Sequence, residues 1–177
     1  MRSDAVISRC GNYRYSLTRK WGAGERKVAW LMLNPSTADA WTDDATIRKC
    51  IGFSMRWGFH QLEVVNLFAL RSSDPKSLRY TKDPFGPDNM RYVLGATCES
   101  EFVVCAWGCE SELRTLRRMG RDPFRLISES FAAKLTFQCL GRSKSGNPYH
   151  PLMLPYSTPL QSFDMEGTLR GKIDRAC

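Results

Sequence analysis

Three polar residues that follow or interrupt apolar stretches carry side chains suited to chemistry. Asn34 comes directly after an apolar run, Asn66 interrupts another, and His150 follows a glycine-flanked loop. A carboxamide can orient a water molecule or read a hydrogen-bonding edge, and an imidazole can donate a hydrogen bond or a proton to a leaving group. These residue types therefore predict a site that hydrolyses or recognises a polar ligand.

Each of the three residues also has a purely structural interpretation. Asn34 can be a turn residue before Pro35, Asn66 a buried amide with its hydrogen bonds satisfied, and His150 a surface imidazole. Their combined placement favours a site, because parallel strands present their carboxyl ends at one edge of a sheet, where open α/β sheets bind ligands.

Four apolar runs predict the strands that position these residues. The first, Val28 to Leu33, is too short for a buried helix and lies between turn-forming residues, which is typical of a strand buried on both faces. The other expected strands are 62–70, 102–107 and 135–140. The segment Tyr13 to Leu17 predicts an edge strand.

Segments with helical periodicity alternate with these strands. A helix is expected to start at 42–44 and to end at Trp57-Gly58, with a buried face made of Ile47, Cys50, Ile51 and Ser54. Further helices are expected at 88–101 and 110–119, whereas 124–127 is expected to be irregular. The turn-rich stretch 71–89 is long enough to predict a functional loop.

This alternation of strands and helices indicates the fold class. It predicts an α/β fold, specifically a three-layer α/β/α sandwich with a mainly parallel central sheet. A chain of 177 residues is expected to form a single domain, 1–177. Its core is expected over residues 28–157, and the tail 160–177 is expected to be loosely packed because it has little pattern.

The charge of the chain favours an acidic partner. Lys and Arg number 26 against 18 Asp and Glu, which gives a net charge of +8, and 42% of the residues are hydrophobic, as in a packed protein. A positive surplus attracts polyanions at long range, so nucleic acid is favoured as a partner.

The seven cysteines and the apolar runs bear on whether a disulfide-rich, metal-binding, membrane or secreted protein is expected. The cysteines contain no C-x-x-C pair, so neither a disulfide framework nor a zinc or iron–sulfur site is indicated. Asp39, Asp43 and Asp44 are an alternative metal site, but helix capping explains the last two more simply. There is no run of about 18 apolar residues and no signal-peptide pattern at the N-terminus. We therefore expect a cytoplasmic monomer with no metal, cofactor or membrane partner.

Four short motifs, in this order along residues 28–157, resemble the uracil-DNA glycosylase superfamily. The strand that ends in Asn34-Pro35 and two hydroxyl residues resembles its water-activating motif, which carries Asp or Asn before that Pro. The segment VVNL around Asn66 resembles the strand whose Asn reads the flipped base. The segment VVCAWG resembles an apolar strand ending in Trp-Gly, and His150-Pro151-Leu152 resembles a loop that supplies a catalytic His and a wedge.

The match is closer to a second group of proteins. The segments MLNPSTADA, DDATIR, VVNLFALR and HPL are similar to a widespread bacterial and phage family known as a domain of unknown function. Three features depart from the glycosylase pattern. Position 34 is Asn, as in the branch that acts on mismatched or modified bases; the serine that follows the HP dipeptide in that loop is missing or replaced by Ser157 or Thr158; and Trp41 is the candidate for the aromatic pocket floor.

The resemblance implies a monofunctional DNA glycosylase that flips a modified base out of the duplex, hydrolyses its N-glycosidic bond and leaves an abasic site. Asn34 and His150 would be the catalytic residues, and Asn66 and Trp41 would recognise the base. Nothing is placed as a Schiff-base lysine. No cofactor is implied.

Contacts to DNA are expected from hydroxyl, basic and apolar side chains. Basic groups and hydroxyls bind phosphates, and an apolar wedge fills the gap that the extruded base leaves. The candidates are Ser36, Thr37, Arg48, Arg71, Arg142, Lys144, Ser145, Leu152, Met153 and Ser157, with Lys49 and Arg56 adding positive charge. Each basic residue can instead belong to a solvated face.

The base itself is left open by the sequence. The resemblance suggests removal of hypermodified pyrimidines, such as glucosylated hydroxymethylcytosine, from phage DNA as antiviral defence. Uracil or mismatch repair is the alternative within the same chemistry. Two further alternatives are a non-catalytic DNA-binding module and an enzyme that acts on free nucleotides.

Overall fold

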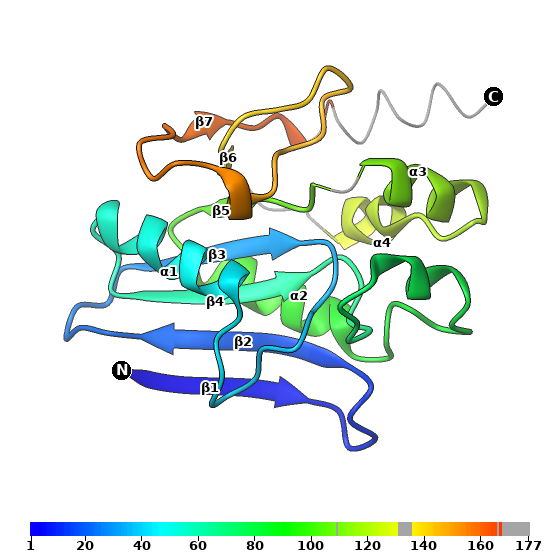
Figure 1. Cartoon of the computed structure of the whole chain (residues 1–177), viewed down its shortest axis with the longest axis horizontal. Helices are drawn as coiled ribbons and strands as arrows, with labels where there is room; N and C mark the ends of the chain where they lie inside the picture. The colour runs from blue at the N-terminus through cyan, green and yellow to red at the C-terminus, as the bar shows by residue number, and fades with distance from the viewer. Residues whose placement is uncertain (109, 131–135, 166, 168–177) are drawn as a thin grey trace.

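The computed structural model describes residues 1–108, 110–130, 136–165 and 167, and within them seven strands form one mixed sheet (Figure 1). The strands are β1 (Arg2–Ile7), β2 (Arg14–Lys20), β3 (Lys27–Met32), β4 (Gln61–Asn66), β5 (Val103–Cys105), β6 (Phe137–Cys139) and β7 (Gln161–Ser162). The helices are α1 (Ala45–Arg56), α2 (Asn89–Cys98), α3 (Glu110–Arg118) and α4 (Pro123–Ser130), with 3-10 helices η1 (Pro75–Arg79) and η2 (Pro151–Met153).

The strand order is β1-β2-β4-β3-β5-β6-β7. The four inner strands β4, β3, β5 and β6 run parallel, whereas β1, β2 and β7 pair antiparallel at the two sides. The expected α/β fold is therefore confirmed, but the sheet is mixed rather than mainly parallel.

The central strand β3 is apolar throughout because both of its faces are covered. Ala29 and Leu31 belong to one buried cluster, together with side chains of α2, α3 and α4. Val28 and Trp30 belong to a second cluster, together with α1. Figure 1 shows α1 and α2 on opposite faces of the sheet. A strand covered in this way has no solvent-facing side on which to alternate polar residues.

Helix α1 forms as its sequence predicts. Asp44 caps it, since its Oδ1 accepts a hydrogen bond of 2.8 Å from the backbone N–H of Ile47. The four side chains expected on the buried face are all buried. The helix ends at Arg56 with Trp57 as its C-cap, followed by Gly58 in the left-handed region with φ +76°.

Several expected elements differ in the structure. The segment from Tyr13 is not an edge strand, because β1 pairs along the outer side of β2. The segment expected to be irregular forms α4 instead, and two residues of the expected loose tail pair with β6 as β7. Phe163 and Met165, which follow β7 in the sequence, are buried, so this part of the tail is packed. Leu135, where the last strand was expected to begin, lies outside the described residues, as do 166 and 168–177.

The long loop 71–89 contains the 3-10 helix η1 and is tied to the sheet. Asp74 caps η1, and the Nδ2 of Asn89, the last residue of the loop and the first of α2, donates a hydrogen bond of 2.9 Å to the carbonyl of Asn66. In the part of the chain that the structure describes, no helix is long and apolar enough to cross a membrane.

Candidate functional site

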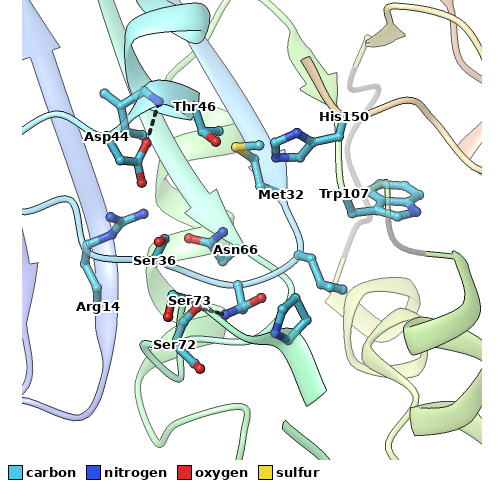
Figure 2. A pocket seen from close by; sticks show the side chains of 14 residues that line it. Arg14, Met32, Ser36, Asp44, Thr46, Asn66, Ser72, Ser73, Trp107 and His150 are labelled. Carbon is cyan, nitrogen blue, oxygen red and sulfur yellow. Dashed lines mark hydrogen bonds between the residues drawn. The ribbon is translucent and has the colours of Figure 1, made fainter. Parts of the chain in front are cut away.

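A pocket of about 190 Å³ lies at the carboxyl ends of β3 and β4 (Figure 2). Its lining includes Asn34, Asn66 and His150, the three polar residues on which the sequence prediction depends. They come from three distant parts of the chain: the end of β3, the end of β4 and the cap of η2. The parallel register of β3 and β4, in which Met32 pairs with Asn66, brings the two strand ends together.

The amide of Asn34 is held by the backbone around it. Its Nδ2 donates hydrogen bonds to the carbonyls of Ser72 at 2.9 Å and Pro35 at 3.1 Å. Because the nitrogen is anchored in this way, the orientation of the carboxamide is fixed, and Oδ1 remains as the acceptor. An amide oxygen in a fixed position can accept a hydrogen bond from a water molecule but cannot remove its proton at neutral pH.

Asn66 presents an unpartnered acceptor. The residue is 2% exposed, and its Oδ1 is buried with no hydrogen-bond partner among the described residues. Buried polar atoms are usually paired, and an unpaired one costs about 1–3 kcal/mol. A ligand N–H or O–H in the pocket would supply the missing donor.

His150 is held in one tautomer. Its Nδ1 accepts a hydrogen bond from the backbone N–H of Leu152 at 3.4 Å, so a neutral ring carries its proton on Nε2. Burial lowers the pKa of His150 below its ordinary value, while the negative charge of Asp44 acts in the opposite direction. At neutral pH the ring is therefore an uncharged donor through Nε2–H.

The Trp-Gly pair after β5 positions this histidine. Gly108 has φ +58°, and a Cβ added there would lie 2.9 Å from the Cβ of His150. Its backbone N–H also donates to the carbonyl of Pro148 at 3.2 Å. Trp107 is fully buried and donates through Nε1 to the Oδ1 of Asn147 at 3.3 Å. A residue without a side chain is needed here because the histidine segment approaches the backbone so closely.

Two charged residues that the sequence analysis did not predict as site residues also line the pocket. Arg14, on β2, is 2% exposed, and Asp44 is the cap of α1. Figure 2 shows them pointing toward one another, on the other side of the pocket from His150 and Trp107. Ser72 and Ser73 also line the pocket and were missed. Their position directly after the second apolar run was a usable signal, whereas Arg14 gave none.

The predicted wedge residues lie next to the pocket. Leu152 and Met153 form η2 directly after His150, and both side chains are exposed, Met153 by 88%. Lys49 and Arg56 of α1 lie over the ring of Tyr156, with the Lys49 Nζ and the Arg56 guanidinium carbon 4.3 Å and 3.9 Å from its centroid. The segment after η2 is thus docked through Tyr156 on the basic residues of α1 by cation–π contacts.

The structure places the remaining predicted residues as follows. Of the hydroxyl residues after Asn34, Ser36 lines the pocket and Thr37 does not. Trp41, the candidate for the aromatic floor, is 92% exposed and does not line the pocket. The residues that also lie outside the lining are Arg48, Arg71, Arg142, Lys144, Ser145 and Ser157.

Two of these arginines have internal partners. Arg71 donates to the carbonyl of Gly11 at 3.2 Å, and Arg142 donates to that of Ser162 at 3.1 Å. Lys144 and Ser145 are exposed in the loop before His150. Within the described residues, no three His, Cys, Asp or Glu side chains form a group able to hold a metal ion.

Comparison with known proteins places the chain in one family. No curated protein and no solved structure matches it. No homologue links it to the uracil-DNA glycosylase superfamily, so that resemblance rests on the four motifs and on the pocket that they form. Residues 14–152, more than half of the chain, match a family model described as protein of unknown function (DUF1643), and the protein belongs to this family.

Proposed function

We propose that the protein is a monofunctional DNA glycosylase that extrudes one base from DNA and hydrolyses its N-glycosidic bond. The observation that supports this most strongly is the convergence of Asn34, Asn66 and His150 on one pocket. With helices on both faces of the inner parallel strands, the fold is in this proposal a three-layer sandwich of the uracil-DNA glycosylase type.

In this proposal the three residues divide the chemistry. Cleavage of a glycosidic bond builds positive charge on the sugar and negative charge on the departing base. Asn34 holds the attacking water through Oδ1, and the Nε2–H of His150 donates a hydrogen bond to the departing base. The C1′–N bond breaks with its electron pair on the base, and the water oxygen bonds to C1′. The proton that the water loses passes through solvent to the base anion, so a neutral base is released. The Oδ1 of Asn66 accepts from an N–H on the base edge. No residue of the pocket is a lysine, and no covalent intermediate is needed.

The surface beside the pocket fits an opened duplex. Leu152 and Met153 are exposed next to His150, where an apolar side chain can fill the space of an extruded nucleotide. The net charge of +8 and the basic residues of α1 attract the phosphates. DNA is therefore the proposed partner, and a cytoplasmic monomer without cofactor is the proposed form.

The pocket volume bears on which base is excised. At about 190 Å³ the pocket is smaller than the roughly 300 Å³ at the lower end of typical ligand sites. A single pyrimidine ring suits this size, whereas a glucosyl group on hydroxymethylcytosine would extend through the open side. A modified pyrimidine of phage DNA remains our first candidate, since a substituent can extend through the open side. Uracil is the second candidate, and the small volume supports it.

The test is a screen of base release. Duplexes that carry glucosylated hydroxymethylcytosine, hydroxymethylcytosine, uracil or no modification are incubated with the protein, and the released bases are identified by mass spectrometry. We expect release of one modified base and alkali-labile strand breaks at its position. Release of uracil alone would contradict the proposal that modified bases of phage DNA are the target. DNA binding without release of any base would contradict the glycosylase proposal.

A further inference from the structure

Arg14 is buried at the pocket, and one of its N–H donors has no hydrogen-bond partner among the described residues. Its side chain is 2% exposed, and its Nη1 donates to the carbonyl of Ala38 at 2.8 Å. Its Nε is buried with no partner among the described residues. Burial lowers the pKa of Arg14 to about 10, which leaves the guanidinium positively charged at neutral pH. A buried cation with an unused donor calls for an acceptor, and the pocket is where a ligand can bring one.

Asp44 brings a negative charge to the same end of the pocket. Its Oδ1 is used by the N-terminus of α1, where Ile47 N–H donates to it. Its charge raises the pKa of Arg14, yet no ion pair within 4.0 Å joins the two in the described part of the chain. The guanidinium of Arg14 and the carboxylate of Asp44 therefore face the same space without forming an ion pair with each other (Figure 2).

The group that fits between them is an alcohol hydroxyl. A hydroxyl accepts from a guanidinium and donates to a carboxylate at the same time, whereas a carbonyl only accepts, an amino group only donates and a methyl group does neither. The hydroxyl residue Ser36 lines the same pocket and adds a further donor and acceptor. Hydrogen bonds to charged groups are the stronger class, so the preference for a hydroxyl is measurable.

The position of this end relative to His150 indicates which part of a base reaches it. His150 lies across the pocket from Arg14 and Asp44, with Asn66 between them in the view of Figure 2. If His150 faces the glycosidic bond at N1 of a pyrimidine, the opposite end faces positions 4 and 5. We propose that Arg14 and Asp44 determine specificity by binding the hydroxyl of a hydroxymethyl substituent at position 5, an inference that rests on the proposed function.

Binding of free nucleobases tests this inference separately from catalysis. The affinities of two matched pairs are measured by calorimetry: 5-hydroxymethyluracil against thymine, and 5-hydroxymethylcytosine against 5-methylcytosine. Within each pair only one hydroxyl differs. We expect the hydroxymethyl member of at least one pair to bind about tenfold more tightly, the effect of one hydrogen bond to a charged group.

Two variants assign this preference to the charged end. Asp44→Asn keeps an oxygen for the α1 cap while removing the charge, and Arg14→Lys keeps the charge while removing Nε and the fork of donors. Both are expected to reduce the tenfold preference to about twofold or less. The matched control is Asp83→Asn, an exposed aspartate that caps a turn through Oδ1 and does not line the pocket.

The outcomes separate the two proposals. Equal affinity within both pairs for the wild-type protein would overturn the inference, and so would a preference that both variants retain. A preference lost in the variants, combined with no base release from any DNA, would support the hydroxyl site and contradict the glycosylase. Base release from DNA without a preference for the hydroxymethyl bases would support the glycosylase and contradict the hydroxyl site.

Discussion

The two ends of the pocket are built in different ways. The uncharged groups Asn34 and His150, which we call the neutral end, are fixed by local main-chain contacts: the carbonyls of Ser72 and Pro35 hold Asn34, and the N–H of Leu152 sets the tautomer of His150. At the opposite end, Arg14 and Asp44 carry full charges and come from β2 and the cap of α1. The first arrangement suits a reaction that needs fixed geometry, whereas the second suits selection of a ligand by its hydrogen-bonding groups.

The largest effect should come from the neutral end. Asn34→Ala and His150→Ala each remove one positioned group, and loss of such a group typically lowers a rate by about 10²–10³-fold. Single-turnover base release measures this, together with the affinity for the same DNA, which should change little. Asn12→Ala, an exposed asparagine outside the pocket, is the control. Rates within threefold of the control would show that these residues do not act in the reaction.

A smaller loss is expected when the neutral end is displaced but not truncated. Gly108→Ala places a Cβ 2.9 Å from that of His150 at a backbone with φ +58°, so the histidine must move. We expect base release to fall by about tenfold, in line with the sensitivity of catalysis to misplacement. Gly11→Ala is the matched control, because Gly11 also has a positive φ, +76°, and a Cβ there meets nothing within 4 Å. Equal rates for the two variants would disprove the positioning role of Gly108.

At the charged end, two variants separate the contribution of Asp44 to stability from the contribution of its charge. Asp44→Ala loses the cap of α1 and should lower the free energy of unfolding by about 0.5–2 kcal/mol, whereas Asp44→Asn keeps a cap oxygen and should lose much less. Urea denaturation monitored by circular dichroism gives both values. If the two variants unfolded at the same denaturant concentration, the loss would not arise from the cap.

The smallest effect links the two ends. Asp44 raises the pKa of His150 against the lowering by burial, so Asp44→Asn should lower it further. The protein has two histidines, and His150→Ala assigns the resonance in an NMR titration. Protonation of Nδ1 would remove the hydrogen bond that Leu152 N–H donates to it, so we expect the proposed base release to fall only as the pH drops through this lowered pKa. A pKa that rises in Asp44→Asn would mean that the ends are not coupled in this way.

The positions of Asn34 and Asn66 at one edge of the sheet follow from the sequence for a physical reason. A strand buried on both faces appears as a continuous apolar run, and a polar residue at its end stands out, as Asn34 does after β3. The register of β3 with β4 then brings Asn66 alongside, which follows from the parallel pairing rather than from either motif alone.

The charged end was missed because its residues have ordinary local explanations. Asp44 is a helix cap and was predicted as one, and only the tertiary structure shows that it also faces a pocket. Arg14 lies within a segment that resembles an edge strand, where an arginine is expected to point to solvent. The strand β1 makes β2 an inner strand, and the loop after β3 lies against the guanidinium, whose Nη1 donates to the carbonyl of Ala38, so the arginine is buried.

The misplacement of Trp41 has a similar cause. Its aromatic type suggested a stacking role, but sequence gives no direction for a side chain in a loop. The turn in which Asp39 accepts from the N–H groups of Trp41 and Thr42 leaves the indole in solvent.

The most direct test of the central claim is a structure of the protein bound to a duplex whose target nucleotide carries a 2′-fluoro group that resists cleavage. We predict one nucleotide extruded into the pocket, with Asn66 against its base edge and the Nε2 of His150 facing the base oxygen next to the glycosidic bond. A duplex bound elsewhere on the protein with its bases all stacked, and the pocket empty, would contradict the account.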